Sequence, residues 1–455
     1  MSITATADHE SRLKIRQATR AGAIGNLIEF FDFSLYGFFA VMISKLFFPT
    51  ISPVAALLAT FAVYGGAFVM RPVGAIVFGH IADRVGRRRA LMISVVLMSL
   101  STALIGMLPG YAQIGVFAPA LLLLCRLTQA FSAGGEQSNS YVLVIEHSPV
   151  KQRGRNGSWL VVSVMLGVVA GILLSLLMES VTSDAQMEAW GWRVPFIVAV
   201  PLGLLGLYLR IKLQDSDVFK DAHATIANEP RRHSPLVQAL RTVPKEMLIL
   251  FGWIALVSLA GYILIGFMVT LLVKFEGYDM SAALGILAVS FLIGIPAVLA
   301  ICRWADHLPR KVFATANAVA MLLWTLPAFW LVGQGPIGAG IALTVWIIIM
   351  YPMNLVAGFA VVELFPVDIR ASASGVPYQL GFAIFGGSAP YLATWLTSSL
   401  SSMSVAYYVA AVALIGILVA IFGIPNAREM AVVSTVDKSG LQFDDGNTLD
   451  DVPVP

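Results

Sequence analysis

Five ionisable residues lie within long apolar stretches of the sequence: Glu29, Asp32, Arg71, Arg126 and Glu136. A charged side chain near the middle of a bilayer costs at least about 2.5 kcal/mol on insertion scales, so each should be paired or should line a cavity. Carboxylates can take up and release protons, whereas arginine stays charged and can hold a carboxylate through two parallel hydrogen bonds. This set therefore predicts the binding of a small acid together with protons.

We expect Asp32 to pair with Arg126 and an incoming carboxylate to compete for that arginine while Asp32 takes up the proton. Glu29 lies three residues before Asp32 and should share a helix face with it. Glu29 and Glu136 are further candidate proton carriers, and Arg71 is a second candidate for binding substrate. The alternative for all of them is a buried ion pair that only fixes helix packing.

Neutral polar residues in the same stretches are candidates for lining the cavity. They are Gln129, Asn139, Tyr36 and Tyr64 in the first half of the chain and Tyr378 and Gln379 in the second. The cysteines, Cys125 and Cys302, stand in different apolar stretches and form no metal or disulfide pattern. We expect no metal and no cofactor.

The composition shows what must position these residues. Only 12% of the 455 residues are charged and 58% are hydrophobic, whereas soluble proteins carry about 25% charged residues. So few charges exclude a cytosolic enzyme or a disordered chain, and a net charge of +3 is too small for a nucleic-acid binder. The chain is expected to be an integral membrane protein, with its first apolar run too long for a signal peptide.

A bilayer core needs about 20 apolar residues per helix. The apolar runs and their polar breaks predict twelve spans, near 20–44, 54–79, 90–109, 116–145, 157–179, 192–210, 247–273, 282–303, 312–332, 337–361, 372–397 and 404–424. Most of the 29 Lys and Arg residues then fall in the segments on one side. By the positive-inside rule, both termini are expected in the cytoplasm.

Two loop motifs repeat between the halves of the chain and indicate a duplicated six-helix unit. GHIADRVGRRR after the second span resembles CRWADHLPRK after the eighth, and EHSPVKQR after the fourth resembles ELFPVDIR after the tenth. Charged residues at these positions can form a breakable latch between the halves, although the basic ones can also serve topology alone. The candidate gating residues are Gly79, Asp83, Arg84, Gly86, Arg87, Arg88, Glu146, Arg153, Asp306, Glu363 and Arg370.

These motifs resemble those of the major facilitator superfamily and, more narrowly, its metabolite:proton symporter family. GNLIEFFDFSLYGFF, FVMRPVGAIVFG, RLTQAFSAGGE, WGWRVPF and AIFGGSAPYLATWL carry the narrower resemblance, which covers nearly the whole chain. The resemblance implies an all-α fold of two pseudo-symmetric six-helix bundles and proton coupling. Asp32 and Arg126 match, by motif position, an Asp–Arg coupling pair of proton-driven sugar relatives.

Our sequence-based expectation is a proton-coupled importer of a small organic acid, a di- or tricarboxylate or a cyclic acid, working by alternating access. The alternatives are a proline or betaine symporter, a proton-driven efflux carrier and a membrane-embedded enzyme. Osmosensing relatives tend to carry a long C-terminal coiled coil, which the short acidic tail lacks. The fifth span lacks the proline of exporters, and no His or Cys cluster supports an enzyme.

The expected domains are an N-terminal bundle (1–210), a linker (211–246), a C-terminal bundle (247–425) and a disordered acidic tail (426–455). The expected partners are a small carboxylate, protons and the lipid bilayer, with no nucleic acid. We expect the chain to act as a monomer in a bacterial cytoplasmic membrane.

Overall fold

The computed structural model describes residues 3–85, 87–134, 140–142, 144–145, 148–211, 235–366 and 369–425. Within these ranges, the description leaves out the side chains of 3–14, 16–18, 21, 79–80, 82–85, 87–88, 91, 150, 209–211, 235–238 and 371. All regular secondary structure in this described part is helical, as the long apolar runs predict.

The helices of the first half are α1 (Ile3–Phe38), α2 (Ala40–Phe47), α3 (Pro53–Gly66), η1 (Ala67–Val69), α4 (Met70–Val85), α5 (Arg87–Met107), α6 (Tyr111–Ile114), α7 (Phe117–Ala133), η2 (Val150–Gln152), α9 (Arg153–Val181), α10 (Asp184–Gln186), η3 (Met187–Gly191), α11 (Arg193–Ile197) and α12 (Ala199–Ile211). The second half contains α14 (Pro235–Thr242), α15 (Pro244–Tyr262), η4 (Ile263–Phe267), α16 (Met268–Thr270), η5 (Leu271–Phe275), α17 (Met280–Trp304), η6 (Ala305–His307), α18 (Arg310–Val332), α19 (Pro336–Glu363), α20 (Arg370–Gly381), η7 (Phe382–Gly386), α21 (Gly387–Ser399) and α22 (Ser402–Phe422).

The described helices trace the twelve predicted crossings, six in each half. Eight helical segments of the described part are long and apolar enough to span a membrane by themselves. The first crossing is bent, because Gly22–Phe38 and Ala40–Phe47 meet at 61°. The apolar parts of α5 and α7 are shorter, and α20 begins with Arg370, so these crossings are less apolar than the rest.

The largest differences from the predicted boundaries lie at the first span and in the linker. α1 begins at Ile3 rather than near residue 20, so the helix continues through a polar, charged segment that hydropathy could not assign. The predicted linker contains α14, and α15 begins at Pro244. The predicted tail, 426–455, lies outside the described residues.

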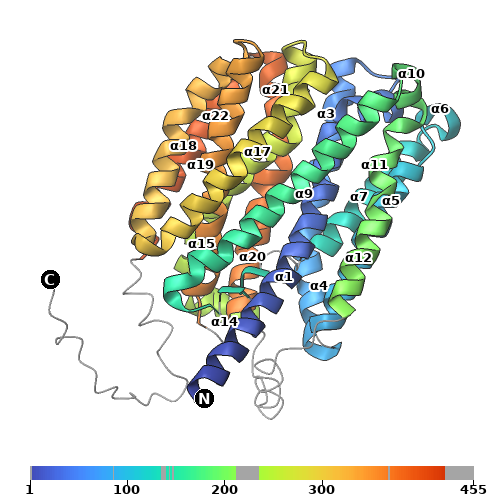
Figure 1. The fold of residues 1–455 in the computed structure, drawn as a ribbon. Helices are drawn as coiled ribbons and strands as arrows, with labels where there is room; N and C mark the ends of the chain where they lie inside the picture. Colours follow the sequence, from blue (N-terminus) through green and yellow to red (C-terminus); the bar gives the residue numbers. More distant parts are fainter. Residues whose placement is uncertain are drawn as a thin grey trace.

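The two halves pack side by side along their length. Figure 1 shows the blue-to-green helices of the first half on one side and the yellow-to-red helices of the second half on the other, with α9 and α17 crossing next to each other. Further contacts between the halves join α3 to α21, α4 to α20 and α1 to η4. The functional side chains described below lie along this interface.

π-Helical turns interrupt two crossings of the second half that face this interface. η4 and η5 follow α15, and η7 separates α20 from α21. A π-helical turn adds a residue to the helical repeat and often marks a functional position. Here the turns place Tyr262, just before η4, and Phe382, at the start of η7, against the first half.

Candidate functional site

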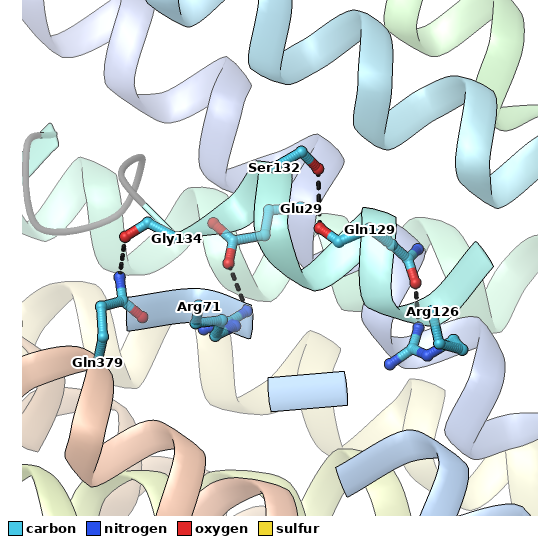
Figure 2. Close-up of polar contacts among 7 residues, drawn as sticks. All are labelled: Glu29, Arg71, Arg126, Gln129, Ser132, Gly134 and Gln379. Atoms are coloured by element: carbon cyan, nitrogen blue, oxygen red, sulfur yellow. Dashed lines mark hydrogen bonds and ion pairs between the residues drawn. The ribbon is translucent and has the colours of Figure 1, made fainter. Parts of the chain in front are cut away.

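Two buried arginines form the centre of the site. Arg71 lies in the first turn of α4 and Arg126 in the middle of α7, and neither side chain is exposed. The guanidinium Nη2 of Arg71 lies 2.8 Å from the Oε1 atom of Glu29 on α1, whose side chain is equally buried (Figure 2). This ion pair compensates both charges within the apolar bundle, as the insertion cost of each charge requires.

Aromatic rings cover the faces of the Arg71 guanidinium. Its central carbon lies 4.6 Å from the ring centroid of Phe33, 4.7 Å from that of Phe68 and 5.4 Å from that of Phe382. Phe33 and Phe68 belong to the first half and Phe382 to the second. Cation–π contacts at such distances stabilise a desolvated cation. Arg71 is therefore held at the interface by both halves of the protein.

Arg126 has a different environment. Its Nη1 donates a hydrogen bond to the Oε1 atom of Gln129, one turn further along α7 (Figure 2). The rings of Tyr36 and Tyr64 each lie 4.6 Å from its central carbon, and Phe33 lies 5.0 Å away. Its Nε and Nη2 atoms are buried without a hydrogen-bond partner in the described part of the chain. A buried cation with unused donors is well suited to bind the carboxylate of a ligand.

Asp32 and Arg126 are linked through neighbouring side chains, and their predicted direct ion pair stays a prediction. The Oδ2 atom of Asp32 accepts a hydrogen bond of 2.9 Å from the Thr102 hydroxyl on α5. That hydroxyl accepts one of 2.6 Å from the Nε2 atom of Gln129. Gln129 occupies the position beside the guanidinium because residues three apart are neighbours on a helix. Two neutral side chains thus stand between the acid and the arginine.

Glu29 and Asp32 lie on the same helix, as predicted, but they contact different neighbours. Glu29 pairs with Arg71 of α4, whereas Asp32 bonds Thr102 of α5. Glu136 and Asn139, the other predicted polar residues of this region, lie outside the described residues. The roles predicted for Glu29, Asp32 and Glu136 as proton carriers stay predictions.

The second half contributes aromatic and amide side chains. Tyr378 is buried and stacks on Phe382 at a centroid distance of 5.0 Å. Tyr262 packs edge-on against Phe68, also at 5.0 Å. Gln379 donates a hydrogen bond of 2.5 Å from Nε2 to the carbonyl oxygen of Gly134, which joins the halves next to Arg71 (Figure 2).

Sequence reasoning identified Tyr36, Tyr64, Tyr378 and Gln379 but missed the other members of the site. These are Thr102, Phe33, Phe68, Tyr262 and Phe382. A signal for part of this set exists, because the aromatic pairs Phe33/Tyr36 and Tyr64/Phe68 have the spacing of one helix face. Aromatic residues are frequent throughout these spans, so the spacing alone does not single them out.

A small cavity of about 20 Å³ lies beside the aromatic rings of the site and is lined by residues that include Phe30, Ser258, Tyr262, Asn354 and Phe382. This volume holds about one water molecule. Arg126 itself is fully buried, so a solute can reach it only after side chains around it move.

At one end of the bundle, charged residues join the halves, and we call it the Arg153 end. The carboxylate of Asp306 on η6 accepts hydrogen bonds of 2.6 and 2.8 Å from the backbone N–H groups of Gly154 and Arg155. These groups belong to the first turn of α9, where an acidic group is stabilised by the helix dipole. Arg153 also forms an ion pair of 2.7 Å with Glu363 of α19.

The structure thus brings together three of the predicted gating residues, Arg153, Asp306 and Glu363. Arg310, which was not predicted, lies 3.5 Å from Glu363 through its Nε atom. Arg370, which follows Glu363 by seven residues, is buried and donates a hydrogen bond to the carbonyl oxygen of Phe365. The remaining predicted gating positions, Gly79, Asp83, Arg84, Gly86, Arg87, Arg88 and Glu146, lie outside the described residues or have side chains outside the description.

On the other side of the arginines, glycines allow the two halves to touch backbone to backbone. A Cβ atom at Gly65 of α3 would collide with the carbonyl of Gly387 of α21, and one at Gly37 of α1 would collide with that of Ile265. Gly65 adjoins Tyr64 and Gly37 adjoins Tyr36, so these contacts lie beside the rings around Arg126. Larger residues would hold the halves apart here.

Comparison with known proteins identifies the class of protein to which this fold and site belong. The chain is similar to the proline/betaine transporter of Salmonella typhimurium, with 34% identity over 417 residues that cover 90% of this chain and 83% of the relative. It is 33% identical to the glycine betaine/proline/ectoine/pipecolic acid transporter OusA of Dickeya dadantii over 418 residues, with the same coverage. The chain is a multi-pass membrane transporter and not an enzyme.

Solved structures show the same architecture. The proton:xylose symporter XylE bound to 6-bromo-6-deoxy-D-glucose superposes with a TM-score of 0.70 over 91% of this chain and 97% of that chain, at 16% identity. A partially occluded, inward-open form of the Escherichia coli xylose transporter gives 0.68 over 91% and 99%, also at 16% identity. The profile of the Major Facilitator Superfamily matches residues 22–377. The chain belongs to the Major Facilitator Superfamily.

Proposed function

We propose that the protein is a proton-coupled symporter of a zwitterionic osmolyte of the proline or betaine type. This replaces the organic acid that the sequence suggested, because transporters that are 33–34% identical over 90% of the chain are named for proline and betaine. The observation that supports it best is Arg126, a buried guanidinium with two unused donors that is surrounded by aromatic faces.

Each end of such a solute has a matching group in the site. The carboxylate would accept hydrogen bonds from the Nε and Nη2 atoms of Arg126, a planar donor pair suited to two oxygens. The quaternary or secondary ammonium group would lie against ring faces, which attract desolvated cations. Tyr36, Tyr64 and Phe33 are already within 5.0 Å of the guanidinium centre, so a short solute can reach both.

The charge balance of the described site favours a neutral solute over a di- or tricarboxylate. Glu29 compensates Arg71, and the formal charge of Asp32 balances that of Arg126 through the hydrogen-bonded side chains between them. A dicarboxylate would bring an additional negative charge for which the described site offers no further cation. Unpaired buried charges are costly, so the second carboxylate should be excluded.

The membrane potential adds to this preference. A zwitterion carried with one proton moves a single positive charge inward, which an inside-negative potential favours by about 2.3 kcal/mol per 100 mV. A dicarboxylate would need additional protons to be drawn inward.

We also propose that the protein lies in the bacterial cytoplasmic membrane with both termini in the cytoplasm. The Arg153 end is then the cytoplasmic gate, and a monomer is the functional unit.

Uptake into proteoliposomes tests this function. The purified protein is reconstituted and offered labelled betaine, proline, citrate or 2-oxoglutarate, with and without an imposed inward proton gradient. We expect gradient-dependent accumulation of betaine or proline and little accumulation of the other two. Accumulation of citrate or 2-oxoglutarate in preference to both zwitterions would refute the proposal.

A pair of arginine variants tests the residue that carries the argument. Arg126→Ala should abolish binding of the zwitterion, because it removes the guanidinium whose unused donors lie beside the rings of Tyr36 and Tyr64. Arg303→Ala is the matched control, since this exposed arginine lies over Trp159, away from the site. Equal uptake by the two variants would show that Arg126 does not bind the solute.

A further inference from the structure

A continuous chain of hydrogen bonds runs from Arg126 to Asp32 through two neutral side chains. Nη1 of Arg126 donates to Oε1 of Gln129, and Nε2 of Gln129 donates to the Thr102 hydroxyl at 2.6 Å. The Thr102 hydroxyl lies 2.9 Å from Oδ2 of Asp32. All four side chains are fully buried, and they come from α7, α5 and α1. Figure 2 shows the first link of the chain.

The Thr102 hydroxyl has one proton and two acceptors within reach. Its oxygen lies 2.9 Å from Oδ2 of Asp32 and 2.9 Å from the carbonyl oxygen of Met98 in the preceding turn of α5. A hydroxyl can donate one hydrogen bond and accept two. Gln129 donates to one accepting position of the Thr102 oxygen. The single Thr102 proton can therefore be donated either to the Asp32 carboxylate or to the Met98 carbonyl.

This choice depends on whether Asp32 carries a proton. When Asp32 is ionised, Thr102 donates to it, because a hydrogen bond to a charged acceptor is the stronger one. When Asp32 is protonated at Oδ2, the new O–H donates to Thr102, and the Thr102 proton rotates to Met98. In both states every donor of Thr102, Gln129 and Asp32 in this chain has a partner, so the exchange leaves no buried polar group unpaired.

We propose that Thr102 and Gln129 couple proton binding at Asp32 to carboxylate binding at Arg126. The inference rests on the proposed symport and assigns its coupling to two neutral residues. In the ionised state all donors point the same way, from cation to anion, and each bond strengthens the next. Protonation of Asp32 removes the anion and reverses the last bond. Arg126 then lacks a compensating charge and binds a carboxylate more tightly.

The other charged groups at this depth have contacts of their own. Among the described elements packed around α1 they are Arg71 and Arg126, and Glu29 lies on α1 itself. Glu29 forms an ion pair of 2.8 Å with Arg71. The tyrosines that face Arg126, Tyr36 and Tyr64, contact it through their rings. The path through Gln129 and Thr102 joins the carboxylate of Asp32 to Nη1 of Arg126.

By reciprocity, a carboxylate bound at Arg126 must favour protonation of Asp32 by the same factor. Loading of the carrier then requires both events, which is the condition for symport without proton leakage. Removing the Thr102 hydroxyl should break this linkage but leave both end groups in place.

The test compares Thr102→Val, which keeps the shape, with Thr102→Ser, which keeps the hydroxyl, in the full-length protein in proteoliposomes. Thr325→Val is the control for fold, because Thr325 is also buried but bonds only the Met321 carbonyl in its own helix. Gln129→Leu interrupts the chain at its second link. Each variant is measured for betaine and proline exchange at equal pH on both sides, for proton-driven accumulation, and for the pH dependence of solute affinity.

We expect Thr102→Val and Gln129→Leu to lower proton-driven accumulation about tenfold more than they lower exchange. Their solute affinity should be nearly independent of pH, whereas that of the wild type, Thr102→Ser and Thr325→Val should depend on it. A loss of exchange and accumulation in equal proportion would indicate a packing role and overturn the inference, as would wild-type coupling in Thr102→Val. If Thr102→Val does not fold, the test uses Gln129→Leu and Thr102→Ser. The inference then requires that solute affinity depends on pH in Thr102→Ser and does not in Gln129→Leu.

Failure of the proposed function gives a different result. If wild-type protein exchanges neither betaine nor proline, the osmolyte proposal is wrong irrespective of Thr102. If the wild type accumulates either one with the proton gradient and Thr102→Val does so equally, the symport stands and the coupling route is wrong.

Discussion

Breaking the buried ion pair between Glu29 and Arg71 should destabilise the protein more than breaking any exposed pair. Both side chains are fully buried, and their N–O distance is 2.8 Å. Removing one partner of a buried pair leaves the other charge uncompensated and costs about 3–5 kcal/mol. In Glu29→Leu, the rings of Phe33 and Phe68 face Arg71 as they do in the wild type, so these contacts do not change the difference between the two proteins. We therefore expect a loss of about 3–5 kcal/mol.

The double variant Glu29→Leu/Arg71→Met should recover most of that loss, because an apolar pair replaces the charges without leaving either one unpaired. The assay is a double-mutant cycle on the free energy of unfolding, followed by fluorescence during titration with denaturing detergent. The comparison cycle removes Arg153 and Glu363, whose side chains are 16% and 4% exposed; because Glu363 keeps Arg310 as a second partner, the coupling should be smaller than that of Glu29 and Arg71. Additive losses at Glu29 and Arg71 would refute the reasoning.

Further predictions concern the ends of the bundle and the charge of the site. Gly65→Leu should prevent the contact with the Gly387 carbonyl and abolish transport, whereas Gly66→Leu, which has open space around its Cβ position, should remain active in the same uptake assay. Asp306→Asn should weaken the hydrogen bonds to the first turn of α9 and so raise maleimide labelling of the buried Cys302. The same substitution combined with Cys302→Ser shows which labelling comes from Cys302. Unchanged labelling would contradict a latch at this end. Glu29→Gln should leave the charge of Arg71 uncompensated and so raise the affinity of the site for citrate relative to betaine. The ratio of the two affinities is measured by competition of citrate with betaine exchange. An unchanged ratio would contradict the argument that charge balance excludes a second carboxylate.

The arrangement of the spans follows from the sequence because hydropathy, basic loop residues and internal repeats are properties of single segments. The charge-free runs that gave the later spans correspond within a few residues to the segment from α15 to η5 and to α17, α18, α19 and α22. The bend between α1 and α2 could not be predicted, since no proline or polar break marks it. The early start of α1 was missed because a helix can continue into water, where hydropathy carries no information.

The connections within the site required the structure. Asp32 and Arg126 were correctly singled out as buried charges, but their spacing along the chain says nothing about what stands between them. Thr102 could not be singled out, because threonine is common in membrane helices and usually bonds only the carbonyl four residues earlier, as Thr325 does. Its second contact, to Asp32, depends on how α5 packs against α1. The phenylalanines around Arg71 were missed for the same reason.

The expectation of an organic acid rested on arginines that can hold a carboxylate through two hydrogen bonds. The sequence does not show which acids neutralise Arg71 and Arg126. In the structure, both guanidinium groups keep two nitrogen atoms without a hydrogen-bond partner among the described residues, but Arg71 is paired directly with Glu29 and is covered by rings. Arg126, among aromatic faces, matches one carboxylate joined to one organic cation. The charge balance of the buried site, rather than the number of arginines, therefore indicates the charge of the solute.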